Sequence, residues 1–150
     1  MTTMSRARNP LSFPVVRAGA AYFALVYGAG FTLGLVRVPF LVPRFGERVA
    51  ELLETPIMLV VIYFSSRYVV RRFALASSAR FAVAVGVVAL VLLLAAELLL
   101  AVALQGDSIA AYISGRDPIS GTVYLASVLL YAVMPWLQTR GISVSARHDA

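Results

Sequence analysis

The chain has 150 residues, of which 61% are hydrophobic and 13% are charged, whereas an average soluble domain is roughly 45–50% apolar and about 25% charged. Its apolar residues form long blocks, and a chain of this size cannot bury that much apolar surface in its own core. These features exclude an ordinary soluble domain. They predict an all-α membrane protein whose main partner is the lipid bilayer.

The missing residue types exclude several kinds of chemistry. There is no cysteine, which rules out disulfides and thiolate sites, and the single histidine, His148, cannot by itself bind a haem or build a histidine-based metal centre. All 13 basic residues are arginines, and they flank the apolar blocks instead of forming one basic surface. We therefore expect no cofactor, no metal and no nucleic acid.

Four apolar segments have the length of a membrane span, for which about 20 residues are needed. They cover about 18–38, 56–76, 81–104 and 122–137. The sequence thus predicts a flexible cytoplasmic lead (1–16), a four-helix transmembrane domain (17–138) and a polar cytoplasmic tail (139–150). Because the fourth segment is short, its helix either begins in the preceding loop, near Ile119, or is tilted little.

An amphipathic segment separates the first two spans. The chain is broken at Pro39 and Pro43, and acidic residues then follow at helical spacing up to Thr55. We expect this segment to form an interfacial helix. Thr55 and Pro56 match an N-cap and a first helical turn, and they predict that the second span begins there.

The arginines predict the orientation, because basic residues concentrate on the cytoplasmic side of a membrane. With four spans, nine arginines share a side with both termini and four lie on the other side. The nine are Arg6, Arg8, Arg17, Arg67, Arg71, Arg72, Arg80, Arg140 and Arg147. We expect a multi-pass protein of the bacterial inner (plasma) membrane with both termini inside.

The first span is rich in glycine. It contains Gly28, Gly30 and Gly34, with Ala20 and Ala24 at four-residue spacing before them. Small residues at this spacing allow another helix to approach closely, which supplies packing in lipid. The favoured interpretation is tight packing within the bundle, and the alternative is a seam between two copies of the chain.

Glu97 lies deep in the third span, where a carboxylate is costly unless it is protonated or paired. It is roughly 24 Å along the helix from Phe81, in the outer half of the membrane, at a level that Arg37, Glu51 and Glu54 also reach. These four residues form a candidate intramembrane polar cluster. Either Arg37 and Glu97 form a structural pair, or Glu97 couples proton or substrate movement; a dry, paired Glu97 favours the first interpretation.

Two further groups of charges have simple interpretations. The acidic stripe that includes Glu47 is able to bind a divalent cation, but Arg44 and Arg48 are near enough to neutralise it as surface pairs. The basic group of Arg67, Arg71 and Arg72 lies at the inner boundary, where arginines contact lipid head groups. Arg67 is the deepest of the three, and the alternative for this residue is that it lines a pathway.

The stretch 18–73, together with Ala96-Glu97, resembles a group of small uncharacterised four-helix inner-membrane proteins of proteobacteria. The motifs that carry the resemblance are Gly30-x-x-x-Gly34, Arg37, Pro43-Arg44-x-Gly46-Glu47, Ala50-Glu51, Glu54-x-Pro56 and Arg67. The resemblance covers about two thirds of the chain. It implies a topology and a compartment, and it brings no known reaction.

No nucleophile, metal or cofactor constellation is evident, which favours a protein that is not an enzyme. The leading hypothesis is an accessory or self-assembling membrane component that forms a homodimer or joins a larger membrane complex. The alternative is a small transporter or channel that uses Glu97 and Arg37. A third class, an enzyme acting on lipid head groups through Glu51 or Glu54, has no specific motif.

Overall fold

The computed structural model describes residues 13–100 and 118–148, and this part of the chain is helical without strands. Its long helices are α1 (Phe13–Val36), α3 (Glu47–Arg72), α4 (Ala79–Leu100) and α6 (Pro118–His148). Shorter elements connect them: the π-helix η1 (Arg37–Leu41), α2 (Val42–Phe45) and the 3-10 turn η2 (Leu75–Ser77). The part of the polar tail up to His148 is thus helical, and the predicted loop at 101–117 lies outside the described residues.

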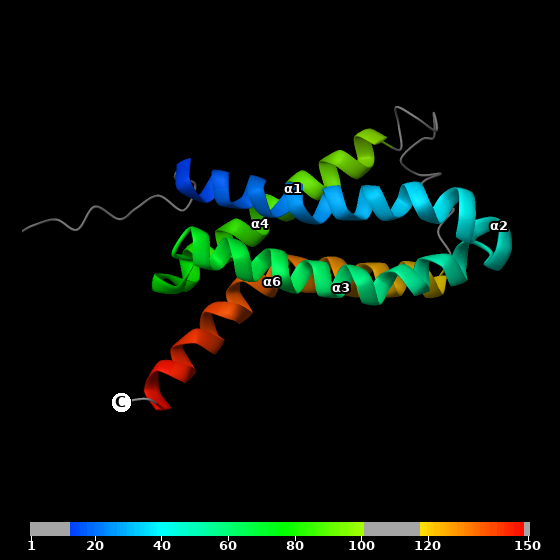
Figure 1. The fold of residues 1–150 in the computed structure, drawn as a ribbon. Helices are drawn as coiled ribbons and strands as arrows, with labels where there is room; N and C mark the ends of the chain where they lie inside the picture. Colours follow the sequence, from blue (N-terminus) through cyan, green and yellow to red (C-terminus); the bar gives the residue numbers. More distant parts are fainter. Residues whose placement is uncertain (1–12, 101–117, 149–150) are drawn as a thin grey trace, which may run out of the picture.

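Four helices are long enough and apolar enough to cross a membrane. They run up and down, so that the start of α1, the end of α3, the start of α4 and the C-terminal part of α6 share one end of the bundle (Figure 1). Around the bundle, α1 packs on α4, α4 on α6, α6 on α3 and α3 on α1. The helix of the fourth span begins at Pro118, which confirms the alternative that it starts in the preceding loop near Ile119.

The segment between the first two spans differs from the prediction. The chain turns through η1, where Val42 donates its N–H to the carbonyl of Arg37 because the nearby prolines cannot complete an α-helical pattern. Gly46 then takes a φ of 78° between α2 and α3, a conformation that glycine adopts without strain. Residues 47–55 form the first part of α3 instead of a separate helix.

The predicted helix start at Thr55 is therefore wrong. The Thr55 hydroxyl donates to the carbonyl of Glu51 one turn earlier, at 3.0 Å, and so does not cap the residues that follow. Pro56 lies inside α3. A proline removes one backbone hydrogen bond from a helix, and membrane-type helices tolerate this where neighbouring groups satisfy the freed carbonyl.

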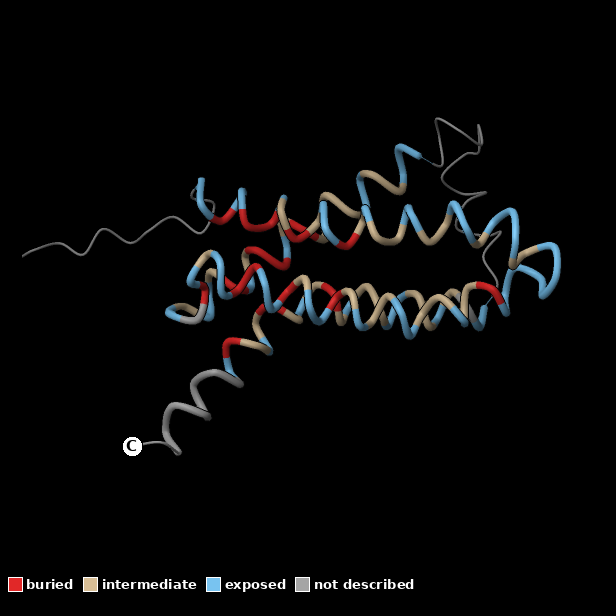
Figure 2. Tube along the Cα trace, in the orientation of Figure 1, coloured by how far each residue is buried: buried red, intermediate tan, exposed pale blue. Residues whose placement is uncertain are grey.

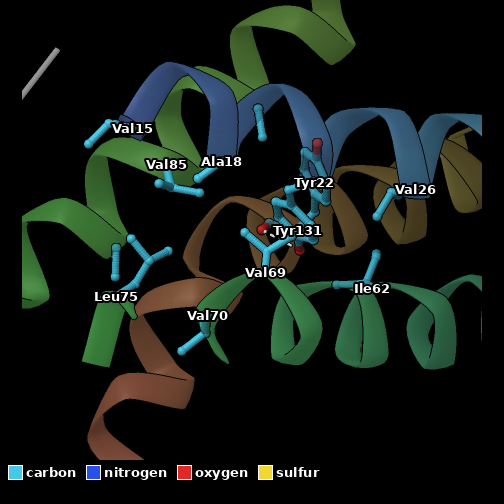
Figure 3. Packing of buried hydrophobic residues seen from close by; sticks show 12 residues of the cluster. Val15, Ala18, Tyr22, Val26, Ile62, Val69, Val70, Leu75, Val85 and Tyr131 are labelled. Carbon is cyan, nitrogen blue, oxygen red and sulfur yellow. Dashed lines mark hydrogen bonds between the residues drawn. The ribbon is translucent and has the colours of Figure 1, made fainter. Parts of the chain in front are cut away.

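The core occupies one half of the bundle, toward the start of α1 and α4 and the end of α3. Figure 2 shows most buried segments there, whereas the half near α2 is mainly intermediate or exposed. Tyr22 and Tyr131 stack at the centre with ring centroids 4.6 Å apart (Figure 3). Both side chains are almost completely buried, so these two rings join α1 to α6 across the bundle.

A proline creates the polar contact of this core. Pro135 lies inside α6 and is buried, and because it has no N–H it cannot bond to the carbonyl four residues earlier, that of Tyr131. The Tyr22 hydroxyl donates to this carbonyl at 3.1 Å. The lost helical bond of α6 is thus replaced by an interhelical bond from α1.

Two glycines allow the closest helix contacts. A Cβ at Gly86 of α4 would lie 1.9 Å from the carbonyl oxygen of Ala132 in α6, and a Cβ at Gly19 of α1 would lie 2.6 Å from the side chain of Val88. Only a residue without a side chain fits at Gly86, because the obstacle is backbone. The level of Tyr22 and Tyr131 is therefore also a level at which the backbones of α4 and α6 lie close together.

Gly86→Ala should lower the free energy of unfolding by about 1–3 kcal/mol, because the added methyl group forces α4 and α6 apart. The matched control is Gly28→Ala, where a Cβ has open space and the gain in helix propensity raises stability by up to about 1 kcal/mol. Denaturation of the detergent-solubilised monomer with sodium dodecyl sulfate, followed by circular dichroism, measures both. Equal effects of the two substitutions would contradict the assigned contact.

Candidate functional site

Arg37 joins the end of the first span to the beginning of α3. Its Nη1 lies 3.1 Å from Oε1 of Glu51, and its Nε lies 3.0 Å from Oε2 of Glu54. The second contact is an ion pair whose N–H is not aligned for a hydrogen bond. The side chains of Arg37 and Glu54 are 23% and 19% exposed. One guanidinium thus holds two carboxylates in a partly buried fork.

Local geometry explains why these three side chains meet. Glu51 and Glu54 are three residues apart and so lie on one face of α3. Arg37 is the first residue of η1, where the chain begins to turn back toward α3, and the positive φ of Gly46 completes the reversal. The prolines and glycine of this connection therefore direct the arginine toward the acidic face of α3.

The fork connects the end of the first span to α3. Both carboxylates are already engaged by Arg37, and no group of three or more acidic or histidine side chains able to hold a metal occurs within residues 13–100 and 118–148. Removing Arg37 would leave two partly buried carboxylates beside each other, which is costly. The arrangement therefore has the features of a structural lock between α1 and α3.

Glu97 does not join this fork. Its Oε2 accepts a hydrogen bond from the hydroxyl of Tyr124 in α6, and the ion pairs of Arg37 in the described chain go to Glu51 and Glu54. The expected pair between Arg37 and Glu97 is thus not formed. Figure 1 shows that α4 crosses α1 and that its C-terminal end then diverges from α1.

The predicted packing glycines also differ from those observed. A Cβ at Gly28 or Gly34 would meet nothing within 4 Å, and one at Gly30 would meet only the end of the flexible Met58 side chain, at 3.3 Å. The glycines that allow the closest helix contacts inside the bundle are instead Gly19 and Gly86. Packing within the bundle is therefore not found at Gly28 and Gly34, whereas Gly30 faces Met58 of α3. The alternative, a seam with a second helix outside the bundle, stays open.

The basic residues at the end of α3 face outward. Arg67, Arg71 and Arg72 are all exposed, so Arg67 does not line an interior pathway in this structure. Together with Phe64 and Tyr68 they line a shallow hollow on the surface of α3. The described acidic residues are at the opposite end of the bundle.

Three important residues escaped the sequence interpretation. Tyr124 gives a weak signal, as a hydroxyl in the fourth span at the level of Glu97. Gly86 stands alone in an apolar segment, and Tyr22 is one of several aromatics in α1. Neither of these two lies in a pattern that distinguishes it from its neighbours.

A double-mutant cycle should separate the two polar contacts. We expect Arg37→Gln and Glu54→Gln to show a coupling energy of about 1–2 kcal/mol, because they share a partly buried ion pair. Arg37→Gln and Glu97→Gln should be additive within about 0.5 kcal/mol. Denaturation of the detergent-solubilised protein with sodium dodecyl sulfate, followed by circular dichroism, measures both cycles. Stronger coupling of Arg37 to Glu97 than to Glu54 would contradict the structure.

Comparisons with known proteins add no identity to this geometry. No protein-family model, no curated protein and no solved structure matches the chain. The function proposed below therefore rests on the contacts of the chain itself.

Proposed function

We propose that this chain is a non-catalytic multi-pass protein of the bacterial inner membrane that acts by assembling, with a second copy or as an accessory subunit of a larger membrane complex. A row of small residues on the outer face of α1 carries the proposal. The row consists of Ala20, Ala24, Gly28 and Thr32, which follow at four-residue spacing and are all exposed.

The row is suited to contact with another helix in lipid. Hydrophobicity does not drive helices together there, so close backbone approach between small residues supplies the attraction. The hydroxyl of Thr32 already donates to the carbonyl of Gly28 at 2.8 Å, and burying this residue therefore leaves no polar group unsatisfied. Among the four spans, the first has the smallest share of buried residues.

An aromatic ridge runs beside the row. Phe23 and Tyr27 have ring centroids 5.1 Å apart, and Tyr27 and Phe31 have centroids 6.4 Å apart. Because each of these rings lies one residue before a member of the small-residue row, the ridge and the row are neighbouring stripes of α1. A second copy related by a twofold axis presents the same ridge and the same row. The ridge of each copy can therefore lie against the row of the other.

The polar contacts support assembly over transport. Glu97 is bonded to Tyr124, and Arg37 is held by two carboxylates. Such pairing is typical of residues that fix helices against each other, whereas a coupling carboxylate has to exchange its partner during a transport cycle.

The orientation with both termini in the cytoplasm is part of this proposal. The up-and-down arrangement puts both ends of the described chain at the same end of the bundle (Figure 1), and the nine-to-four distribution of arginines favours that end as the inner one. The resemblance to small inner-membrane proteins of proteobacteria favours the same compartment.

Reporter fusions test the orientation. Green fluorescent protein fused after Ala150 should fluoresce, because it folds in the cytoplasm, and alkaline phosphatase inserted within 105–117 should be active, because it folds in the periplasm. As controls, the two reporters are exchanged, with alkaline phosphatase after Ala150 and green fluorescent protein within 105–117, and neither should then give a signal. Activity of the same reporter at both positions would disprove four crossings.

Cysteine cross-linking tests the assembly. Since the chain has no cysteine, Gly28→Cys introduces a single thiol, and oxidation in native membranes should link two copies of the 16.1 kDa chain. The control is Val60→Cys, an exposed position on α3, which should give little dimer. A product of Gly28→Cys with a different membrane protein supports the accessory role.

A bulky residue in the row provides a second test. Gly28→Ile should abolish the cross-link of Ala20→Cys without unfolding the monomer, because a side chain at Gly28 meets open space in the bundle. Equal cross-linking with and without Gly28→Ile, or equal dimer from Val60→Cys, would show random collision and refute the row as an interface.

A further inference from the structure

We infer that the C-terminal end of α3 carries a binding site for an anionic phospholipid, with the head-group phosphate held by arginines and an acyl chain lying along the helix. The inference requires the proposed membrane placement but does not depend on assembly. It rests on the residues that line the hollow of α3, which are Phe64, Arg67, Tyr68, Arg71 and Arg72.

These five residues form one continuous face. Their spacing of three, one, three and one residues repeats along a single side of a helix, and all five are exposed. They cover slightly more than the last two turns of α3, which ends at Arg72. A ligand lying along this side therefore contacts all of them without entering the bundle.

The three guanidinium groups have no acidic partner within residues 13–100 and 118–148. Both ion pairs of Arg37 go to Glu51 and Glu54. The acidic residue of α3 nearest to the three arginines is Glu54, which lies roughly 20 Å from Arg67 along the helix. Within the described part of the chain, three formal positive charges thus stand together without compensation. An occupant of this face must bring negative charge.

The order of the residues identifies the occupant. Phe64, which is 62% exposed, lies nearest the middle of the apolar span, Tyr68 follows one turn later, and Arg71 and Arg72 end the helix. A phospholipid has the same order, with an apolar chain in the membrane interior and a phosphate at its boundary. An acidic soluble protein or free phosphate has no use for an exposed phenylalanine at membrane depth.

Arginine is well suited to the phosphate. Its planar guanidinium offers parallel N–H groups to two phosphate oxygens, and it loses less hydration than an ammonium group. Arg67 lies roughly one turn deeper than Arg71, and its long side chain can extend toward the boundary. The guanidinium groups of Arg67 and of Arg71 and Arg72 therefore contact a phosphodiester from two successive turns of α3, and the hydroxyl of Tyr68 lies between these turns.

Native mass spectrometry of the detergent-purified full chain tests the site, with phosphatidylglycerol as the anionic probe and phosphatidylethanolamine as the zwitterionic one. The wild type should retain phosphatidylglycerol preferentially. Arg71→Gln with Arg72→Gln should weaken its binding about thirtyfold, since each arginine near an anionic surface contributes about fivefold. Arg17→Gln with Arg80→Gln removes the same charge elsewhere and should leave binding within about threefold.

Two additional measurements keep the result clear. Phe64→Ala retains all three charges and should still weaken lipid binding, and inorganic phosphate in excess should not displace the lipid. An equal loss in the control pair would show general electrostatic attraction, and displacement by inorganic phosphate would show a free-anion site; either result overturns the inference. Monomer and dimer peaks are read separately, so failure of the proposed assembly does not affect this readout.

Discussion

The structure depends on the contact between α4 and α6 at Gly86. In lipid, helices do not gain free energy by hiding apolar side chains from each other, so they must gain it from close packing and hydrogen bonds. Gly86 brings α4 directly against the backbone of Ala132. Pro135, three residues after Ala132, leaves the carbonyl of Tyr131 without its helical bond, and Tyr22 of α1 donates to that carbonyl. The lack of a side chain at Gly86 lets α4 contact α6, and the lack of an N–H at Pro135 lets Tyr22 bond α1 to α6. Three helices are thus connected at one level.

This contact divides the bundle into two different halves. Near the tyrosine pair the helices are close and the residues buried, whereas toward α2 the helix α4 diverges and burial falls (Figures 1 and 2). The open half is held by polar contacts: Arg37 connects α1 with α3, and Glu97 connects α4 with α6. Where packing is weak, a few charged or hydrogen-bonded pairs maintain the arrangement, because exposing them to lipid unpaired would be costly.

The sequence predicted features that depend on local order along the chain. The four apolar segments follow from length and hydropathy, and the shared face of Glu51 and Glu54 follows from their spacing. The partner of Glu97 and the identity of the packing glycines depend on how each helix is rotated about its axis. A helix that is apolar on all sides carries no periodic signal for that rotation, so Gly28 and Gly86 look alike in sequence although one faces outward and the other meets a backbone.

The same limit explains the helix start at Thr55. Locally, Thr55 followed by Pro56 satisfies the rules for an N-cap, but α3 runs through both residues from Glu47 to Arg72. A cap is worth about 1 kcal/mol, and a local signal of that size does not determine whether the residues before it already belong to the helix.

The charged residues of the described chain are unevenly distributed along the bundle. The four described acidic residues, Glu47, Glu51, Glu54 and Glu97, all lie toward α2, where Arg37, Arg44 and Arg48 also lie, while Arg67, Arg71 and Arg72 lie at the other end of α3. A soluble protein interleaves opposite charges and neutralises them internally, whereas under the proposed orientation nine of the thirteen arginines share one side of this chain. Within residues 13–100 and 118–148, Arg67, Arg71 and Arg72 have no carboxylate partner. With the proposed membrane placement, the most abundant source of negative charge at this end of α3 is the lipid itself.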